Sequence, residues 1–401
     1  MDKSKLFITI TLLSALYACN GKKEKTTFSG KPREISFESR DTLRLYKDSL
    51  NFRFANLDKI SKDSLLAFNY PFLDLTLINT KLDIIKRISK KADIKDGFTG
   101  DFIDPIWTKK SMVVFQQGNA SSISIYDGHL NFSKNIKLFN KIYPYFLPSI
   151  SSQAVMTNFG PNRYDFLLSV YRLDVSQNTA EFYSKSATFL RLAIDTSGNI
   201  LEKTFLAPYN SFTEVKAALD DNTKDWDGPS PSFDYFNGET YVFYEFSDKL
   251  FIYDSSFRKP KEIPLMWPDY NWERSNVSFT KKGVKTDIGE SMKTSFKLRF
   301  SKPFLIDLKY KDGLVFMHFI KPVKDEALPQ TSIQERDFIY QTFLLIIDPK
   351  APTNQKYIDL KDDFSPYSKI YPLDRNNIML FGNFKKTDNY ELIKIKLNDK
   401  N

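Results

Sequence analysis

Leu250–Leu265, with the sequence LFIYDSSFRKPKEIPL, contains a short apolar run, an aspartate, a polar turn and a second segment with spaced apolar residues. An Asp or Asn that ends an apolar run favours a turn, because its side chain accepts hydrogen bonds from nearby backbone and tolerates left-handed conformations. Two such runs around a polar turn are typical of a β-hairpin. The stretch therefore predicts a hairpin whose turn begins at Asp254.

The same pattern recurs along the chain. It is found in LTLINTKLDIIKRI from Leu75, ISIYDGHLNFSKNIKL from Ile123, LRLAIDTSGNILEKTFL from Leu190 and LLIIDPKAPTNQKYIDL from Leu344. The turn residues are Asn79, Asp127, Asp195, Asp254 and Asp348, with a weaker sixth copy that ends at Asn398. Their spacings of 48, 68, 59, 94 and 50 residues indicate a unit of about 50 residues with insertions.

Further apolar runs precede each hairpin, for example ETYVFYEF from Glu239, so each unit is predicted to be an antiparallel meander of three or four strands. Repeated meanders of this length are typical of propeller blades. We therefore expect an all-β fold, a six-bladed β-propeller of antiparallel three- to four-stranded blades, in one domain over residues 34–401. One short helix is expected in SFTEVKAALDD from Ser211.

The last unit offers only three strands, in KIYPLD, NIMLFGNF and YELIKIKL. An open sheet edge invites aggregation, so the ring is expected to be closed by a strand from elsewhere. Arg33–Phe37 (REISF) or Leu43–Lys47 (LRLYK) could supply it.

The first 18 residues have the composition of an export signal. Lys3 and Lys5 precede an apolar run, Leu6–Leu16, that is too short to span a membrane. Leu16-Tyr17-Ala18-Cys19 resembles a bacterial lipobox, and Cys19 is the single cysteine of the chain. We expect cleavage after residue 18, lipidation (palmitate) at Cys19 and a flexible tether over residues 19–33; the alternative is an ordinary signal peptide with a chance cysteine.

The segment after Cys19, NGKKEK, has neither an Asp next to the cysteine nor an acidic cluster. By resemblance to sorted lipoproteins, this predicts a cell-envelope protein, lipid-anchored in the outer membrane and facing the periplasm, with surface exposure as the alternative. The net charge of +9 comes from scattered lysines, which favours a solvated surface over a nucleic-acid partner. The expected partners are the membrane, through the anchor, and a glycan or envelope protein.

With the lipobox, the repeated hairpins and the final YELIKIKLND, the whole mature chain resembles TolB-like six-bladed β-propellers. More closely, it is similar to an uncharacterised family of propeller lipoproteins from Bacteroidetes-type bacteria, known as a domain of unknown function. The resemblance implies a propeller fold and an envelope location, and it implies no activity.

Catalytic and metal-binding motifs are scarce. The two histidines, His129 and His318, are far apart in sequence, and the chain has no HExxH or paired-cysteine pattern, so no metal site and no cofactor are expected. The chain also lacks a G-x-S-x-G elbow and any Gly-x-Gly loop. DDNTKDWDG from Asp220 is interpreted as an Asp-rich turn, since it lacks the bidentate Glu of a calcium loop.

The candidate ligand-binding residues are aromatic. Each tryptophan is expected in a connection between the last strand of one unit and the first strand of the next, which places all of them at one end of the disc, opposite the hairpin turns. The predicted site consists of Trp107, Trp226, Trp267, Tyr270, Trp272 and Arg274. Exposed aromatic rings beside charges suit sugar stacking or peptide capture; the alternative is that tryptophans fill the spaces between blades.

Three hypotheses follow. The favoured one is a non-enzymatic binding or scaffold module that recognises a glycan, peptide or protein at the loop-rich face. The second is a propeller-type carbohydrate-active enzyme, a glycosidase or lyase that uses paired carboxylates. The third is a structural partner in an envelope complex.

Overall fold

The structure is a computed structural model, and it describes most of the strands and the segments that join them. The described residues are 30–45, 57–59, 64–69, 74–79, 83–89, 102–107, 111–116, 122–127, 131–146, 154–160, 162–226, 228–229, 231–268, 277–281, 294, 297–298, 301–322, 341–361, 369–383 and 390–398. Cys19, the expected signal segment and the start of the expected tether lie outside these ranges.

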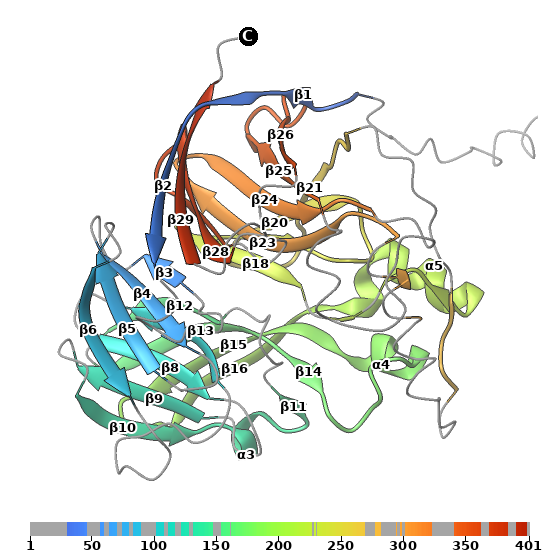
Figure 1. Cartoon of the computed structure of the whole chain (residues 1–401). Helices are drawn as coiled ribbons and strands as arrows, with labels where there is room; N and C mark the ends of the chain where they lie inside the picture. Colours follow the sequence, from blue (N-terminus) through green and yellow to red (C-terminus); the bar gives the residue numbers. More distant parts are fainter. Residues whose placement is uncertain are drawn as a thin grey trace, which may run out of the picture.

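The described chain is mostly β-sheet, and its strands are grouped in consecutive antiparallel sheets (Figure 1). The first sheet contains β3 (Leu57–Lys59), β4 (Ser64–Asn69), β5 (Asp74–Asn79) and β6 (Ile84–Ser89). The second contains β7 (Phe102–Trp107), β8 (Ser111–Gln116), β9 (Ser122–Asp127) and β10 (Phe132–Lys137). The third contains β12 (Ala154–Phe159), β13 (Arg163–Ser169), β15 (Ala187–Asp195) and β16 (Ile200–Pro208).

The C-terminal half continues the pattern. The fourth sheet contains β18 (Ser232–Phe236), β19 (Glu239–Phe243), β20 (Lys249–Tyr253) and β21 (Lys261–Pro264). The fifth contains β23 (Phe304–Lys311), β24 (Leu314–Ile320), β25 (Thr342–Ile347) and β26 (Lys356–Lys361). The sixth contains β27 (Lys369–Pro372), β28 (Asn377–Asn383) and β29 (Tyr390–Asn398).

Two N-terminal strands pair with the last two sheets. β1 (Arg33–Glu34) runs parallel to β26 at the edge of the fifth sheet. β2 (Ser36–Leu45) runs antiparallel to β29 along its whole length and becomes the fourth strand of the sixth sheet. Segments from the two ends of the chain therefore share one sheet.

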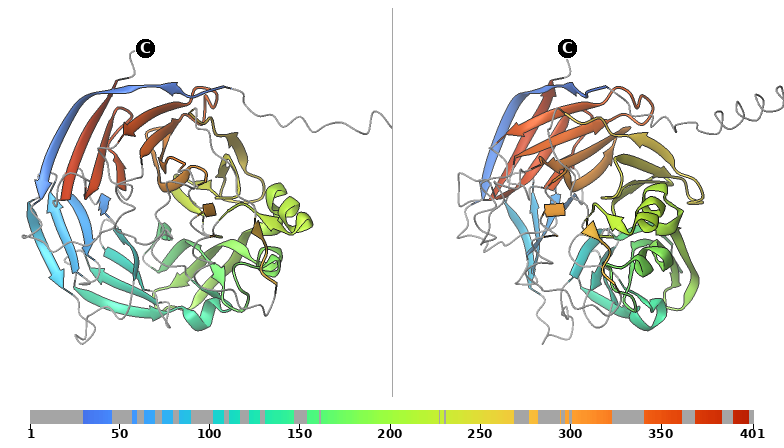
Figure 2. Two further views of the ribbon diagram at one scale, coloured as in Figure 1. Left: turned by 45° about the vertical axis from the view of Figure 1, so that its right-hand side comes forward. Right: turned by 90° about the vertical axis from the view of Figure 1, so that its right-hand side faces the viewer.

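The sheets follow one another around a common centre (Figure 2). In chain order, the first strand of each sheet contacts the first strand of the next, from β3 through β7, β12, β18 and β23 to β27. The first strands are therefore the inner ones, and the chain is a β-propeller.

The predicted hairpin turns are confirmed. Asn79, Asp127 and Asp195 end the third strands of their sheets, and Asp254 and Asp348 directly follow theirs. In the third sheet, Oδ1 of Asp195 accepts hydrogen bonds from the backbone N–H of Ser197 (2.9 Å) and Asn199 (2.8 Å). The Asn199 side-chain amide donates to Oδ2 at 2.8 Å, and these bonds lower the pKa of Asp195.

The connections along the chain contain short helices and two-stranded sheets. They are α3 (Phe139–Ile142), α4 (Ala180–Lys185), the 3₁₀ helix η1 (Tyr209–Ser211), α5 (Thr213–Asp221) and the pairs β11 (Tyr145–Phe146) with β14 (Tyr171–Arg172) and β17 (Thr223–Lys224) with β22 (Val277–Ser278). α5 confirms the predicted short helix and buries Val215 and Ala218. Phe212 occupies its N-cap position, without a side-chain hydrogen bond to the helix. No helix in the described ranges combines the length and apolar composition needed to cross a bilayer.

The core lies in the gaps between successive sheets. The gap between the third and fourth sheets is rich in buried aromatic rings, which include Phe189, Phe233, Phe251, Tyr253 and Phe257. Rings at these distances add edge-to-face attraction to the burial of apolar area, as between Phe189 and Phe233, whose centroids are 5.0 Å apart.

Candidate functional site

The structure does not assemble the tryptophan site that the sequence predicts. Trp226 is only 2% exposed and belongs to the core between the third and fourth sheets. Its Nε1 donates to the hydroxyl of Tyr183 at 2.9 Å, and the two rings meet edge to face at 5.3 Å. The expectation of an exposed ligand-binding ring is wrong at Trp226; there the alternative, a tryptophan that fills space inside the fold, holds.

Trp107 also differs from its predicted place. It is the last residue of β7, paired with Met112 of β8, so it belongs to a strand and not to a connection between units. Trp267 is half-buried, and its ring packs edge to face against Phe319 at 5.2 Å. Tyr270, Trp272 and Arg274 lie outside the described residues. The described part of the chain thus brings none of the predicted site residues together.

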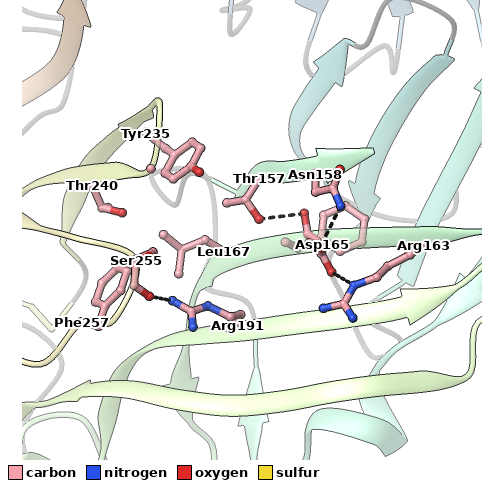
Figure 3. A pocket seen from close by; sticks show the side chains of 12 residues that line it. Thr157, Asn158, Arg163, Asp165, Leu167, Arg191, Tyr235, Thr240, Ser255 and Phe257 are labelled. Carbon is pink, nitrogen blue, oxygen red and sulfur yellow. Dashed lines mark hydrogen bonds and ion pairs between the residues drawn. The ribbon is translucent and has the colours of Figure 1, made fainter. Parts of the chain in front are cut away.

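A pocket of about 240 Å³ lies elsewhere, between the third and fourth sheets (Figure 3). Its lining residues come from β12, β13 and β15 on one side and from the two hairpins of the fourth sheet on the other. They are Thr157, Asn158, Arg163, Asp165, Phe166, Leu167, Arg191, Tyr235, Gly238, Thr240, Ser255 and Phe257. Because strands alternate in direction, the β18–β19 and β20–β21 turns lie at the same end of the fourth sheet. The pocket is therefore at the hairpin end, opposite the end where the site was predicted.

One wall of the pocket holds an ion pair. Arg163 donates through Nε to Oδ1 of Asp165 at 2.6 Å and lies 3.2 Å from Glu202 through Nη2. The hydrogen bond to Asp165 raises the pKa of Arg163. Asn158, opposite Asp165 in the ladder, donates its side-chain amide to Oδ2 of that carboxylate at 3.0 Å. The charge of Arg163 is therefore already matched by carboxylates.

Arg191, on β15, is placed differently. Its guanidinium donates to the backbone carbonyl of Ser255 and lies 5.9 Å from the ring centroid of Phe257 (Figure 3). Within the part of the chain that the structure describes, no carboxylate pairs with Arg191. A guanidinium has five N–H donors, so most of its hydrogen-bonding capacity is available to a bound anion.

The fourth sheet supplies neutral polar groups through its first hairpin. Tyr235 and Thr240 are a cross-strand pair on the side that faces the third sheet, and both line the pocket. Their strands are joined by Asn237 and Gly238, with φ angles of 49° and 89°. Both residues thus have the positive φ of a type I′ turn, which favours the Asn-Gly sequence and holds this tip in one conformation.

Arg191 departs from the repeat that builds the sheets. It lies four residues before the turn residue Asp195, and the same position in the other repeats is occupied by Leu75, Ile123, Leu250 and Leu344. Ile123 and Leu250 are fully buried and Leu344 is 2% exposed, and each packs in the gap before the next sheet. The third sheet has a cation where these three sheets have an apolar side chain that fills the gap.

These pocket residues were missed in the sequence, although two signals were present. LRLAID from Leu190 contains one charged residue inside an otherwise apolar strand, and Phe236-Asn237-Gly238-Glu239 contains the strongest short hairpin signal. Neither signal shows which strands face each other. In the described residues, no cluster of three or more His, Cys, Asp or Glu side chains is arranged to hold a metal ion.

Comparison with known proteins gives a fold and no activity. No family model matches the sequence, and no curated protein matches it. Among solved structures, the chain is similar to a member of the DUF4221 family from Bacteroides vulgatus, with a TM-score of 0.62, 13% identity and coverage of 91% of this chain and 98% of that one. It is also similar to a candidate exported protein from Bacteroides fragilis, with a TM-score of 0.51, 10% identity and coverage of 92% and 99%. The chain therefore shares its fold with uncharacterised Bacteroides proteins.

Proposed function

We propose that the chain is a non-enzymatic binding module of the cell envelope, and that the pocket between the third and fourth sheets holds a polar ligand with one anionic group. The observation that carries this proposal is Arg191. A cation replaces an apolar side chain of the repeat at the wall of a pocket, and the fold supplies it with a backbone carbonyl and a ring but no described carboxylate.

The other lining groups suit a ligand with hydroxyls. Thr157, Thr240, Asn158 and Tyr235 line the same pocket as Arg191 and offer it side-chain donors and acceptors. A concave site with a few convergent polar groups on a rigid scaffold is the usual form of a small-molecule site. Asp165 is the single carboxylate among the lining residues and is held by Arg163 and Asn158, so the pocket favours binding over acid–base catalysis.

The proposal extends to the architecture and location. The six sheets of four or five strands are proposed to be the blades of a six-bladed propeller, with the pairing of β2 and β29 closing the ring. Export and an outer-membrane lipid anchor at Cys19 are proposed from the N-terminal sequence, and a solved protein of the same fold carries a name that refers to export.

The test compares D-galacturonate with D-galactose, two sugars that differ in one carboxylate. Galacturonate is expected to bind and galactose to bind at least 10-fold more weakly, because a hydrogen bond to a charged group contributes about 1.5–3 kcal/mol. Arg191→Gln should remove this preference. Arg258→Gln is the matched control, since it removes the same charge from an exposed position on the β20–β21 hairpin.

The affinities are measured by titration calorimetry on the folded protein. Equal affinities of the two variants, or no binding of galacturonate, would overturn the proposal.

A further inference from the structure

Phe236 is an exposed aromatic residue at the tip of the β18–β19 hairpin, whose Tyr235, Gly238 and Thr240 line the pocket. Its side chain is 53% exposed, although it directly follows Tyr235, which lines the pocket. Successive residues of a strand point to opposite faces of the sheet. The tip of the β18–β19 hairpin therefore carries Tyr235 on the side of the third sheet and Phe236 on the side of the fifth.

The ring of Phe236 is held in place by a stack of aromatic rings. It lies 4.9 Å from the ring of Tyr310, which in turn stacks on Tyr241 at 4.4 Å with an interplanar angle of 17°. The Tyr241 hydroxyl donates to Oε2 of Glu239 at 2.6 Å, and the backbone N–H of Tyr310 donates to Oδ2 of Asp234 at 2.7 Å. Phe236 is thus the outer ring of a fixed stack, so little side-chain freedom is lost when a ligand covers it.

The hairpin itself does not require an aromatic residue at this position. The fifth sheet has an equivalent two-residue turn, in which Asp312 and Gly313 have φ angles of 48° and 88°. Lys311 pairs with Leu314 across that turn, as Phe236 pairs with Glu239 across its own. The register of Phe236 is therefore occupied by a lysine in the next sheet, and folding alone does not explain an exposed ring.

We propose that Phe236 is a second subsite of the same binding site and that the ligand is an acidic oligosaccharide. An anionic sugar unit occupies the pocket at Arg191, and a neighbouring unit lays its apolar C–H face on the Phe236 ring. This inference rests on the proposed function, and it adds the length and chemical class of the ligand.

The geometry favours a saccharide over an extended peptide. A bound peptide strand needs unpaired backbone N–H and C=O groups along a sheet edge. Of the strands that line the pocket, β13, β15 and β19 each pair with a strand on both sides. The two edge strands, β12 and β18, are the inner strands of their sheets and contact each other. Apart from the paired Arg163 and Asp165, the polar and aromatic side chains that line the pocket offer hydroxyls, an amide, a guanidinium and rings, which match the hydroxyls, carboxylate and C–H faces of an acidic sugar.

The experiment compares galacturonate with trigalacturonate on the full folded chain by titration calorimetry. The trisaccharide is expected to bind at least 10-fold more tightly than the monosaccharide. Phe236→Ala should reduce the affinity for trigalacturonate about 5- to 30-fold and change that for galacturonate by less than about twofold, since only the longer ligand reaches the ring. Phe236→Trp should keep the tighter binding of trigalacturonate relative to galacturonate. Phe205→Ala, which alters a partly exposed phenylalanine on β16, is the control and should change neither affinity.

The possible failures are distinguishable. If galacturonate binds through Arg191 but the trisaccharide shows no gain, or if the two Phe→Ala variants behave alike, the second subsite is wrong and the pocket proposal stands. If neither sugar binds, both proposals are wrong. If triglutamate binds more tightly than trigalacturonate and depends on Phe236, the ligand is a peptide and the saccharide assignment is overturned.

Discussion

Asp307→Asn is expected to weaken the junction between the fifth and sixth sheets. Asp307 lies on the inner strand β23 and is only 2% exposed. Its Oδ1 accepts the backbone N–H of Leu308 at 3.0 Å, and its Oδ2 accepts the backbone N–H of Ile370, on β27 of the next sheet, at 3.1 Å. Nζ of Lys309 lies 4.0 Å from Oδ1. One carboxylate therefore satisfies two backbone donors and joins two sheets.

The expected loss in the free energy of unfolding follows from the backbone donor that Asp307→Asn leaves unpaired. An asparagine has one side-chain oxygen, and its NH₂ group cannot accept a hydrogen bond. One of the two backbone N–H groups then faces another donor, and a buried donor without a partner costs about 1–3 kcal/mol. The variant also loses the attraction between the Asp307 carboxylate and partly exposed Lys309, which lowers the free energy of unfolding by at most about 1 kcal/mol. A neutral amide is easier to bury than a carboxylate, and this difference offsets that loss. We expect the free energy of unfolding to fall by about 1–3 kcal/mol.

The assay is urea unfolding at neutral pH, followed by tryptophan fluorescence, for wild type, Asp307→Asn and Asp312→Asn. The control removes the same charge from the same sheet, at a position whose side chain is 47% exposed. Its free energy of unfolding should change by less than about 0.5 kcal/mol. If both variants unfold at the same urea concentration with unchanged slopes, the bond across the two sheets does not contribute as argued.

Two further predictions concern the carboxyl group of Asp234 and the N-terminal strands β1 and β2. Burial raises the pKa of Asp234 above its ordinary value of 3.8, so the folded chain holds that proton more tightly than the unfolded chain. The contribution of this proton to stability is complete below the pKa of Asp234 in the unfolded chain and is lost as the pH rises through its pKa in the folded chain. In urea unfolding, wild type should therefore lose stability relative to Asp234→Asn over that pH range. A difference between the two proteins that does not change with pH would contradict this. Deletion through Lys31 should leave the melting temperature nearly unchanged, whereas deletion through Leu45 removes β1 and β2 and should lower it; equal melting temperatures would show that β2 does not stabilise the sixth sheet.

The sequence predicts the hairpins well because their signal is local. An Asp or Asn at the end of a strand accepts hydrogen bonds from residues two to four positions later, as Asp127 does from the backbone N–H of Asn131 at 2.9 Å. In the first sheet the two residue types are exchanged, with the Asn at the end of the strand and the Asp four residues later. Asn79 donates its side-chain amide to the carboxylate of Asp83 and accepts the backbone N–H of that residue. The turn therefore requires a side-chain carbonyl oxygen within a few residues, which a pattern in one sequence can reveal.

Trp226 and Trp107 differ from their predicted environments for two different physical reasons. Trp226 has aspartates on both sides, a composition typical of an exposed turn. Its environment is set by residues that are distant in sequence, Tyr183 and Phe279, whose ring centroids lie 5.3 and 6.2 Å from its own. Trp107 follows Pro105, a residue that is unfavourable in most strands. β7 tolerates this proline because it is the edge strand of its sheet and has a register shift there.

The pocket could not be predicted from the same local signals. Its walls are the third and fourth sheets, and the contact between Arg191 and Ser255 joins residues 64 positions apart. The repeat does allow equivalent positions of the different sheets to be compared. Once the turn residues are aligned, a cation at a position that other sheets fill with buried leucine or isoleucine stands out.

That departure has a cost for the fold, and the cost supports a role in binding. A buried leucine or isoleucine side chain contributes about 1.5–3 kcal/mol relative to an exposed one, and the third sheet lacks this contribution where Arg191 stands. Phe236 is the opposite case, an apolar ring left half in water where the fifth sheet has Lys311. Each change is unfavourable or neutral for folding when considered alone. Both occur at the hairpin end, one on a wall of the pocket and one at the hairpin tip that also lines it, and a ligand that pairs with the cation and covers the ring would recover what each of them loses.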